Sequence, residues 1–253
     1  MDTRPFNPSV IFSVMPELLS FLWVTVLVAV ASILIGSLFG MVLAGGKLGK
    51  NPAGRWLAHG YTYIMRCTPA IVLLFIVFYG LPQLVETLTD YDINDMNRSV
   101  FAIITFSLLF SAYISEVFRA AYEAVPKGQY EAAVSIGLSP LQALRTVVLP
   151  QAAVIALPNF GNSVINLLKE GALAYTIGLI DMLGEGNLII AQNYGAYGIE
   201  IYLACMIIYW GVTTLLSEGF LKLERCLDRG RTAASQVRRA RPMSWSLANT
   251  KNE

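Results

Sequence analysis

The sequence has little of what metal sites, disulfide frameworks and membrane-bound enzymes are built from. It holds one histidine, His59, and three cysteines, Cys67, Cys205 and Cys226, whose spacing fits neither bridges nor a zinc site. We therefore expect free thiols, a structural His59, no metal and no catalytic residue. An integral-membrane enzyme would need clustered histidines, cysteines or paired carboxylates at membrane depth, so that class is disfavoured. No nucleic acid partner is expected.

Charge is also scarce, and long apolar runs take its place. Only 14% of the 253 residues are charged, whereas 55% are hydrophobic, and the mean hydropathy is +0.57. A helix that crosses a bilayer core needs about 20 predominantly apolar residues. The first run, residues 18–46, contains no Asp, Glu, Lys or Arg. The other four runs cover residues 67–85, 99–115, 151–168 and 201–217. These runs predict an all-α integral membrane protein with five transmembrane helices.

The basic residues between the runs predict the orientation, because Lys and Arg concentrate in cytoplasmic loops. The loop after the first run carries Lys47, Lys50 and Arg55 without an acid, whereas the loop after the second, residues 86–98, is rich in acids. Lys and Arg residues also follow the third run, at Arg119, Lys127 and Arg145, and the fifth run, where the tail is basic. We expect the N-terminus outside and the C-terminus in the cytoplasm, which requires an odd number of crossings.

These boundaries divide the chain into three parts. Residues 1–17 form an external N-terminal segment, residues 18–226 form the transmembrane domain, and residues 227–253 form a basic cytoplasmic tail that we expect to be disordered. The stretch from Gly171 to Ile190 is interrupted by charged residues and glycines. It is therefore expected to be a partial or re-entrant helix near the outer face.

A cytoplasmic loop at about residues 123–150 carries helix signals that a plain connector would not need. Residues 129–136 read as a helix that Gly137 ends. Ser139 can cap a second helix, with Pro140 at its first position and Gln142 completing a capping box. The pattern predicts a helix-turn-helix that ends at residues 149–150, where the fourth transmembrane run begins.

This loop carries a family resemblance. The stretch EAAVSIGLSPLQALRTVVLP resembles the EAA loop of ATP-binding-cassette (ABC) importer permeases, except that Val147 stands where the family more often has isoleucine. The matching residues are Glu131, Ala132, Ala133, Gly137, Leu149 and Pro150. The stretch MRCTPAIVLLFIVFYGLP, residues 65–82, is similar to the second helix of the polar amino acid branch, the histidine, glutamine, arginine and cystine type. Residues 174–181 and 197–210 look most like the cystine and sulfur-compound permeases of that branch.

The resemblance implies a type I ABC importer permease in the bacterial cytoplasmic membrane. It implies that the six loop residues dock on ABC ATPase subunits, with Glu131 offering a carboxylate and Ala132 and Ala133 allowing close approach. It also implies a second permease subunit, identical or homologous, and an extracytoplasmic substrate-binding protein. The chain lacks G-x-x-x-x-G-K-[ST], so it would hold no cofactor, and ATP and Mg would be bound and ATP hydrolysed by the partner. The best expectation for the substrate is L-cystine or a related sulfur compound.

Polar residues close the fourth run and are candidates for the substrate path, because ionisable groups at membrane depth are costly. Asn162 and Asn166 lie one turn apart, and Lys169 and Glu170 follow. Together they could meet the amino and carboxyl groups of an amino acid, or Lys169 and Glu170 could simply end the helix at the interface. Arg66 has two interpretations as well, a snorkelling anchor at the cytoplasmic boundary or, with less support, a substrate role.

One rival class stays open at this point. A secondary transporter or channel that does not use ATP often shows internal repeats and helices broken by glycine near the midplane. The sequence has no convincing repeat, although Gly171 and Gly178 would suit a broken helix.

Overall fold

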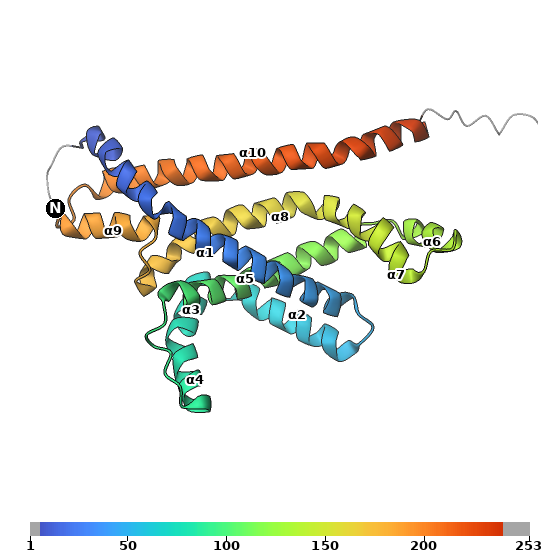
Figure 1. Ribbon diagram of the computed structural model, residues 1–253, viewed down its shortest axis with the longest axis horizontal. Helices are drawn as coiled ribbons and strands as arrows, with labels where there is room; N and C mark the ends of the chain where they lie inside the picture. The colour runs from blue at the N-terminus through green and yellow to red at the C-terminus, as the bar shows by residue number, and fades with distance from the viewer. Residues whose placement is uncertain (1–5, 240–253) are drawn as a thin grey trace, which may run out of the picture.

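The computed structural model describes the backbone of residues 6–239 and the side chains of residues 6–227. Four long helices run alongside one another: α1 (Pro8–Leu48), α5 (Arg98–Glu123), α8 (Leu149–Gly171) and α10 (Gly198–Arg239) (Figure 1). The shorter helices are α2 (Pro52–Cys67), α3 (Ala70–Phe75), α4 (Leu81–Thr89), α6 (Lys127–Ser135), α7 (Pro140–Ala143) and α9 (Met182–Gln192). Two π turns, η1 (Ile76–Gly80) and η2 (Leu144–Val148), and a 3₁₀ turn, η3 (Ala172–Ile177), join some of them. Residues 6–239 contain no strand.

The prediction of five transmembrane helices is confirmed. Within the described residues, five helical stretches are long and apolar enough to cross a membrane. They are Pro8–Leu48, Ala70–Thr89, Arg98–Glu123, Pro140–Ile177 and Gly198–Leu227. Helix α9 is not among them, because its 11 residues would reach only about 16 Å at 1.5 Å per residue. This agrees with the partial helix expected between residues 171 and 190.

The second transmembrane run begins later than the sequence predicted. The predicted run started at Cys67, but this residue ends the separate helix α2, and the spanning helix begins at Ala70. The break lies at Thr68 and Pro69, which are both extended, with ψ angles of 126° and 138°. A residue before proline is pushed out of the helical region, so the Thr-Pro pair forces the chain to turn. The helix that follows, α3–η1–α4, points away from the long helices (Figure 1).

Two of the three Leu-Pro pairs of the sequence follow a π turn, whereas the third, Leu157–Pro158, lies inside α8. The turn η1 precedes Leu81–Pro82, and η2 precedes Leu149–Pro150. Proline lacks the N–H that an α-helix needs, and its ring clashes with the carbonyl four residues earlier, whereas a wider turn relieves the clash. The second helix of the cytoplasmic loop therefore does not end at residues 149–150 as predicted. It continues through η2 into α8 without a break.

The two ends of the bundle carry different segments. Helices α6 and α7, the turn between α1 and α2 and the last part of α10 lie at one end, whereas α9 and the start of α1 lie at the other (Figure 1). The segments that carry the predicted cytoplasmic charges thus share one end, in agreement with an odd number of crossings. The tail differs from the expectation, because α10 continues to Arg239. Its residues 231–239 are rich in Ala, Gln and Arg, which are good helix formers, and residues 240–253 lie outside the described part.

Glycines on α1 let its backbone approach α5 closely. Gly36 and Gly40 are both buried, and a Cβ added to Gly36 would lie 2.9 Å from the backbone oxygen of Ser107. A Cβ on Gly40 would overlap the Ile114 side chain and lie 3.1 Å from the Ser111 oxygen. Small residues spaced four apart are typical of close helix contacts in membranes.

We expect Gly40→Ala to destabilise the protein by about 1–3 kcal/mol, the usual cost of overpacking a filled contact. Gly45→Ala on the same helix is the matched control, because nothing lies within 4 Å of its added Cβ. Its stability should be unchanged or slightly raised, since alanine favours helix over glycine. Thermal unfolding in detergent measures both variants, and equal midpoints would contradict the proposed contact.

A buried carboxylate ties α9 to α1 at the outer end. Asp181 is 1% exposed, and its Oδ1 accepts a hydrogen bond from the Gly184 N–H at 2.8 Å. Thr25 Oγ1 of α1 donates to Asp181 Oδ2 at 3.3 Å. Burial raises the pKa of Asp181 to about 6. On the next turn, burial and the nearby Glu17 raise the pKa of Glu185.

This pKa predicts a pH-dependent stability. The folded state holds the Asp181 proton up to about pH 6, whereas an unfolded aspartate releases it near pH 4. The folded protein therefore binds more protons in this window, and its stability falls as pH rises from about 4 to about 6, by up to roughly 3 kcal/mol from this group. Asp181→Asn should flatten the unfolding profile across that window. The exposed Asp95→Asn should not, and equal profiles for Asp181→Asn and wild type would contradict the assignment.

Candidate functional site: a cytoplasmic docking segment and a polar cavity

The predicted end of the first loop helix is confirmed. Helix α6 ends at Ser135, Ile136 is its C-cap, and Gly137 follows with φ +95°. The Gly137 N–H donates to the Val134 oxygen at 2.9 Å, and the Leu138 N–H donates to the Ala133 oxygen at 3.2 Å. This pair of bonds is a Schellman motif, and it requires a left-handed residue that glycine adopts without strain.

The predicted start of the second helix is also confirmed. The Gln142 N–H donates to Ser139 Oγ at 3.3 Å, and the Ser139 N–H donates to Gln142 Oε1 at 2.9 Å. These reciprocal bonds form a capping box, with Pro140 in the first turn of α7. Local chemistry alone thus fixes the turn between α6 and α7.

Buried small residues hold the turn against the rest of the chain. Ala133 and Ala143 are 4% and 0% exposed. Val125, Val148 and Ala152 form a small apolar cluster beneath it. The segment is thereby anchored to the end of α5 and the start of α8.

The opposite face of the segment is exposed. Glu131 and Ala132 are both exposed, whereas the adjacent Ala133 packs inward, so the two alanines are not equally available to a partner as the sequence suggested. Ile136 is 82% exposed and Leu141 56% exposed. The other exposed residues of the predicted docking set are Gly137, Leu149 and Pro150. The surface joins a carboxylate to large apolar side chains, a composition that suits contact with another protein.

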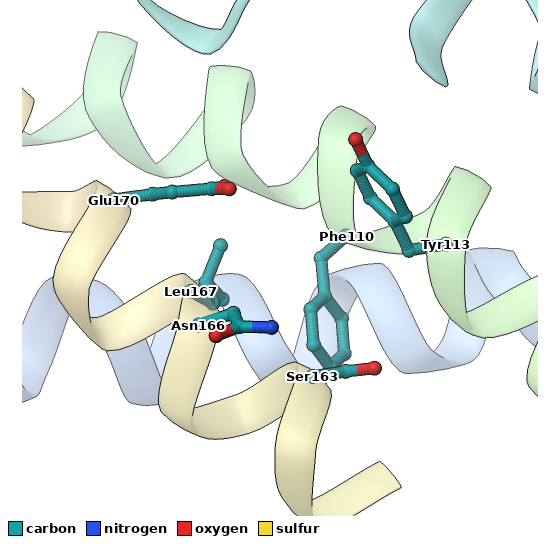
Figure 2. Close-up of a pocket in the computed structure, with 6 residues that line it drawn as sticks. All are labelled: Phe110, Tyr113, Ser163, Asn166, Leu167 and Glu170. Carbon is teal, nitrogen blue, oxygen red and sulfur yellow. The ribbon is translucent and has the colours of Figure 1, made fainter. Parts of the chain in front are cut away.

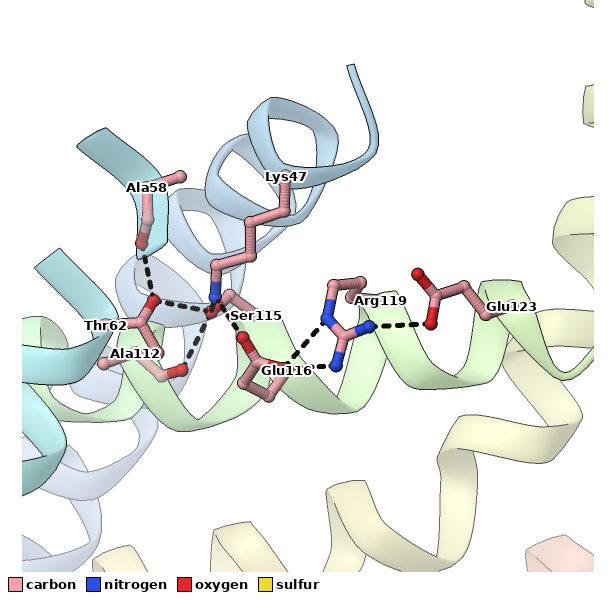
Figure 3. A network of polar contacts seen from close by, with 8 residues as sticks. All are labelled: Lys47, Ala58, Thr62, Ala112, Ser115, Glu116, Arg119 and Glu123. Carbon is pink, nitrogen blue, oxygen red and sulfur yellow. Dashed lines mark hydrogen bonds and ion pairs between the residues drawn. The ribbon is translucent and has the colours of Figure 1, made fainter. Parts of the chain in front are cut away.

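An ionic network lies just before this segment in α5 (Figure 3). Lys47 Nζ of α1, whose side chain is 0% exposed, lies 2.7 Å from Glu116 Oε1 and donates to Ser115 Oγ at 2.7 Å. Arg119 donates to Glu116 Oε2 from both Nε and Nη2, at 2.9 Å and 2.7 Å. Its Nη1 donates to Glu123 Oε2 at 2.7 Å.

The network also reaches α2 and was only partly predictable. Thr62 Oγ1 lies 3.5 Å from Ser115 Oγ, which joins α2 to the same cluster. The sequence suggests the local Glu116–Arg119 pair through its spacing of three, but it contains no signal that Lys47 would join them. Lys47, one of the loop charges from which the orientation was predicted, is thus buried, and its contacts hold the inner ends of α1, α2 and α5 together.

A cavity of about 220 Å³ lies between α5 and α8 (Figure 2). It is lined by Phe110, Tyr113, Ser163, Asn166, Leu167 and Glu170. The Glu170 carboxylate, the Asn166 amide and the Tyr113 hydroxyl point into one space (Figure 2). Polar groups that converge on a partly apolar cavity are typical of a small-molecule site.

The structure brings together two of the four predicted substrate-path residues. Asn166 and Glu170 line the cavity, whereas Asn162 and Lys169 are exposed and lie outside its lining. The face of α8 that lines the cavity runs through Ser163 instead of Asn162. The spacing of three residues from Ser163 to Asn166 and of four from Asn166 to Glu170 could have indicated this face. The α5 contribution, Phe110 and Tyr113, had no signal in the sequence.

Comparisons with known proteins agree with this architecture. Residues 32–223 match the family described as binding-protein-dependent transport system inner membrane component. The L-cystine transport system permease protein TcyL of Bacillus subtilis (strain 168) is 39% identical over 229 residues, which cover 90% of this chain and 95% of TcyL. The histidine/lysine/arginine/ornithine transport system permease protein HisQ of Escherichia coli (strain K12) is 35% identical, over 80% of this chain and 89% of HisQ.

A solved structure has the same fold. The chain superposes on one from a crystal structure of an amino acid ABC transporter with histidines, with a TM-score of 0.76 and 29% identity. The match covers 88% of this chain and 99% of the other. With five spans and a family match over most of its length, the chain belongs to the binding-protein-dependent inner membrane components and is an amino acid ABC importer permease, a multi-pass protein of the bacterial inner membrane.

Proposed function

We propose that this chain is the permease subunit of an ATP-driven importer of a polar amino acid, with L-cystine as the first candidate substrate. The observation that carries the proposal is the exposed segment from α6 to α7, fixed by a Schellman motif and a capping box at the end of the bundle. The choice of L-cystine rests on the similarity to TcyL, whose name states that substrate. The chain itself catalyses no reaction in this account.

The docking segment is the proposed contact with a separate ABC ATPase, which binds ATP and Mg and hydrolyses ATP. Glu131, Ala132 and Gly137 present the contact surface, and Ala133 positions it from within. Leu149 and Pro150 continue the segment into α8 through the π turn η2. Because α7, η2 and α8 form one continuous helix, a movement of the ATPase at α6 and α7 would be passed to the membrane helix directly.

The proposed assembly contains two permease chains, identical or homologous, above two ATPases, with an extracytoplasmic binding protein that delivers the substrate. The proposed substrate path runs along α8. In it, Asn166 and Glu170 contact the amino acid in the cavity, and the exposed Asn162 and Lys169 face the route outside it.

Stimulation of ATP hydrolysis tests this function. The chain is purified with its ATPase and binding protein, and the rate is measured with L-cystine, L-histidine, L-glutamine and L-arginine in turn. We expect one of these to stimulate hydrolysis, and L-cystine first among them. Stimulation by one of the other three amino acids would change the proposed substrate and leave the proposed mechanism standing. No stimulation by any of them would contradict the proposed function.

A further inference from the structure

We propose that Arg66 binds a carboxylate of the transported amino acid at the Tyr113 side of the cavity, while Glu170 binds an ammonium group. This inference rests on the proposed function, because it assigns the cavity between α5 and α8 to the substrate. It adds a residue that lies outside the cavity lining and names the charges that the ligand must carry.

Arg66 lies where α2 ends, two residues before the turn at Thr68 and Pro69. Its guanidinium carbon is 5.6 Å from the centre of the Tyr113 ring, a distance typical of a cation–π contact. Tyr113 in turn lines the cavity and is 40% exposed. The Arg66 guanidinium therefore contacts a side chain, Tyr113, that itself lines the cavity.

Arg66 has a free charge within the described part of the chain. None of the ion pairs found there includes it, and its side chain is exposed. Lys47, a second basic residue near the inner ends of α1 and α5, is already paired with Glu116. A guanidinium keeps five donors in a planar fork that fits a carboxylate.

Glu170 offers the opposite charge on the α8 side of the same cavity. It is half-buried, and it makes no hydrogen bond or ion pair with any of the residues described. Asn166, one turn earlier, also points its amide into the cavity (Figure 2). The neighbouring Lys169 attracts the Glu170 carboxylate electrostatically, but its side chain is exposed and lies outside the cavity lining.

Arg66 pairs with no acid among the described residues, and Glu170 has only the exposed Lys169 as a charged neighbour, so both can still bind an opposite charge on a ligand. A ligand with a single charge would leave one of them without a partner. A zwitterion supplies an ammonium group for Glu170 and a carboxylate for Arg66, and Asn166 adds neutral hydrogen bonds. The arrangement therefore selects amino acids over amines and over amino acid amides.

Arg66 could instead matter only because it steadies the Tyr113 ring, so the test must separate the two roles. The chain is assembled with its ATPase in nanodiscs without the binding protein, which removes the selectivity of that protein. Binding of L-cystine, L-histidine, L-glutamine and L-arginine is measured, followed by binding of the amide of the tightest binder, in which every α-carboxylate is replaced.

We expect wild type to bind the amide about tenfold more weakly than the amino acid, because one charge-assisted pair is lost. Arg66→Gln should weaken amino acid binding by about tenfold and change amide binding by less than about twofold. Arg55→Gln, an exposed basic residue of the same helix, is the matched control and should bind as wild type. Tyr113→Phe keeps the aromatic ring, so this variant should still bind the amino acid more tightly than its amide.

Equal weakening of acid and amide in Arg66→Gln would assign Arg66 to ring support and overturn the inference, as would unchanged binding of both. In either case ATP hydrolysis by wild type would still respond to the amino acid, so the proposed function would stand. If no amino acid of the panel binds to wild type or stimulates hydrolysis, both the inference and the proposed function fail.

Discussion

Gly137→Pro is expected to lower ATP-driven uptake by about tenfold or more, the range of a lost coupling between two sites, while the chain still inserts and folds. Proline holds φ near −65° and has no N–H. Gly137 has φ +95° and donates to the Val134 oxygen at 2.9 Å, so the variant cannot form the turn between α6 and α7. Nothing lies within 4 Å of an added Cβ, and the membrane core is therefore undisturbed.

A matched pair of alanine variants isolates the backbone effect. Gly137 and Gly128 both have open space around an added Cβ, but Gly128 is helical. Gly137→Ala forces alanine into a left-handed conformation at a cost of roughly 1–2 kcal/mol, and uptake should fall. Gly128→Ala should transport as wild type. Uptake is compared with the amount of folded chain in the membrane, and wild-type uptake by Gly137→Pro would contradict the docking role.

Glu131→Lys tests the charge of the same surface. Glu131 is exposed, and its side chain makes no hydrogen bond or ion pair among the described residues, so reversing its charge should not affect folding. We expect the variant to insert normally, to lose uptake and to retain less ATPase on purification. Glu131→Gln, which keeps the shape, should show a smaller loss. A variant with normal ATPase binding and transport would remove Glu131 from the docking surface.

Glu116→Gln is expected to destabilise the protein more than removal of its partner. The Lys47 side chain is 0% exposed. Loss of the Glu116 carboxylate leaves the Lys47 charge buried with only neutral acceptors, Ser115 Oγ and the amide oxygen of the introduced glutamine. Breaking a buried ion pair in this way costs about 3–5 kcal/mol. Lys47→Met leaves Glu116 paired with Arg119 and should cost less.

The double variant makes this prediction sharper. Lys47→Met with Glu116→Gln removes both charges, so it should be more stable than Glu116→Gln alone. Thermal unfolding of the three variants in detergent measures the difference. If the two single costs simply add in the double variant, Lys47 and Glu116 do not interact as the structure indicates.

Features set by neighbouring residues were predictable from the sequence. The five spans follow from long apolar runs. The end of α6 follows from Gly137 and the start of α7 from the Ser139–Gln142 box, which act within a few residues. Features set by distant packing were not. Lys47 and Glu116 are 69 positions apart, and only the folded arrangement shows that they meet.

The remaining differences have local physical causes. The break between α2 and α3 comes from the Thr68–Pro69 pair. The sequence alone did not predict it, because the pair lies inside the apolar run of residues 67–85, which indicates one continuous helix. The cavity was half predicted, because Asn166 and Glu170 of α8 were visible in the sequence as polar residues while the facing side chains of α5 looked like ordinary core. Helix α10 reaches Arg239, since basic composition does not exclude helix where Ala, Gln and Arg dominate.

Uptake into proteoliposomes tests the central claim most directly. The chain is reconstituted with its ATPase and binding protein, and in parallel alone. Uptake of labelled L-cystine and of the other three amino acids is followed with and without ATP on the ATPase side, first without and then with an imposed ion gradient. We predict uptake of one amino acid that requires ATP and the ATPase. Uptake by this chain alone, driven by an ion gradient and indifferent to ATP, would contradict the account and identify a secondary transporter.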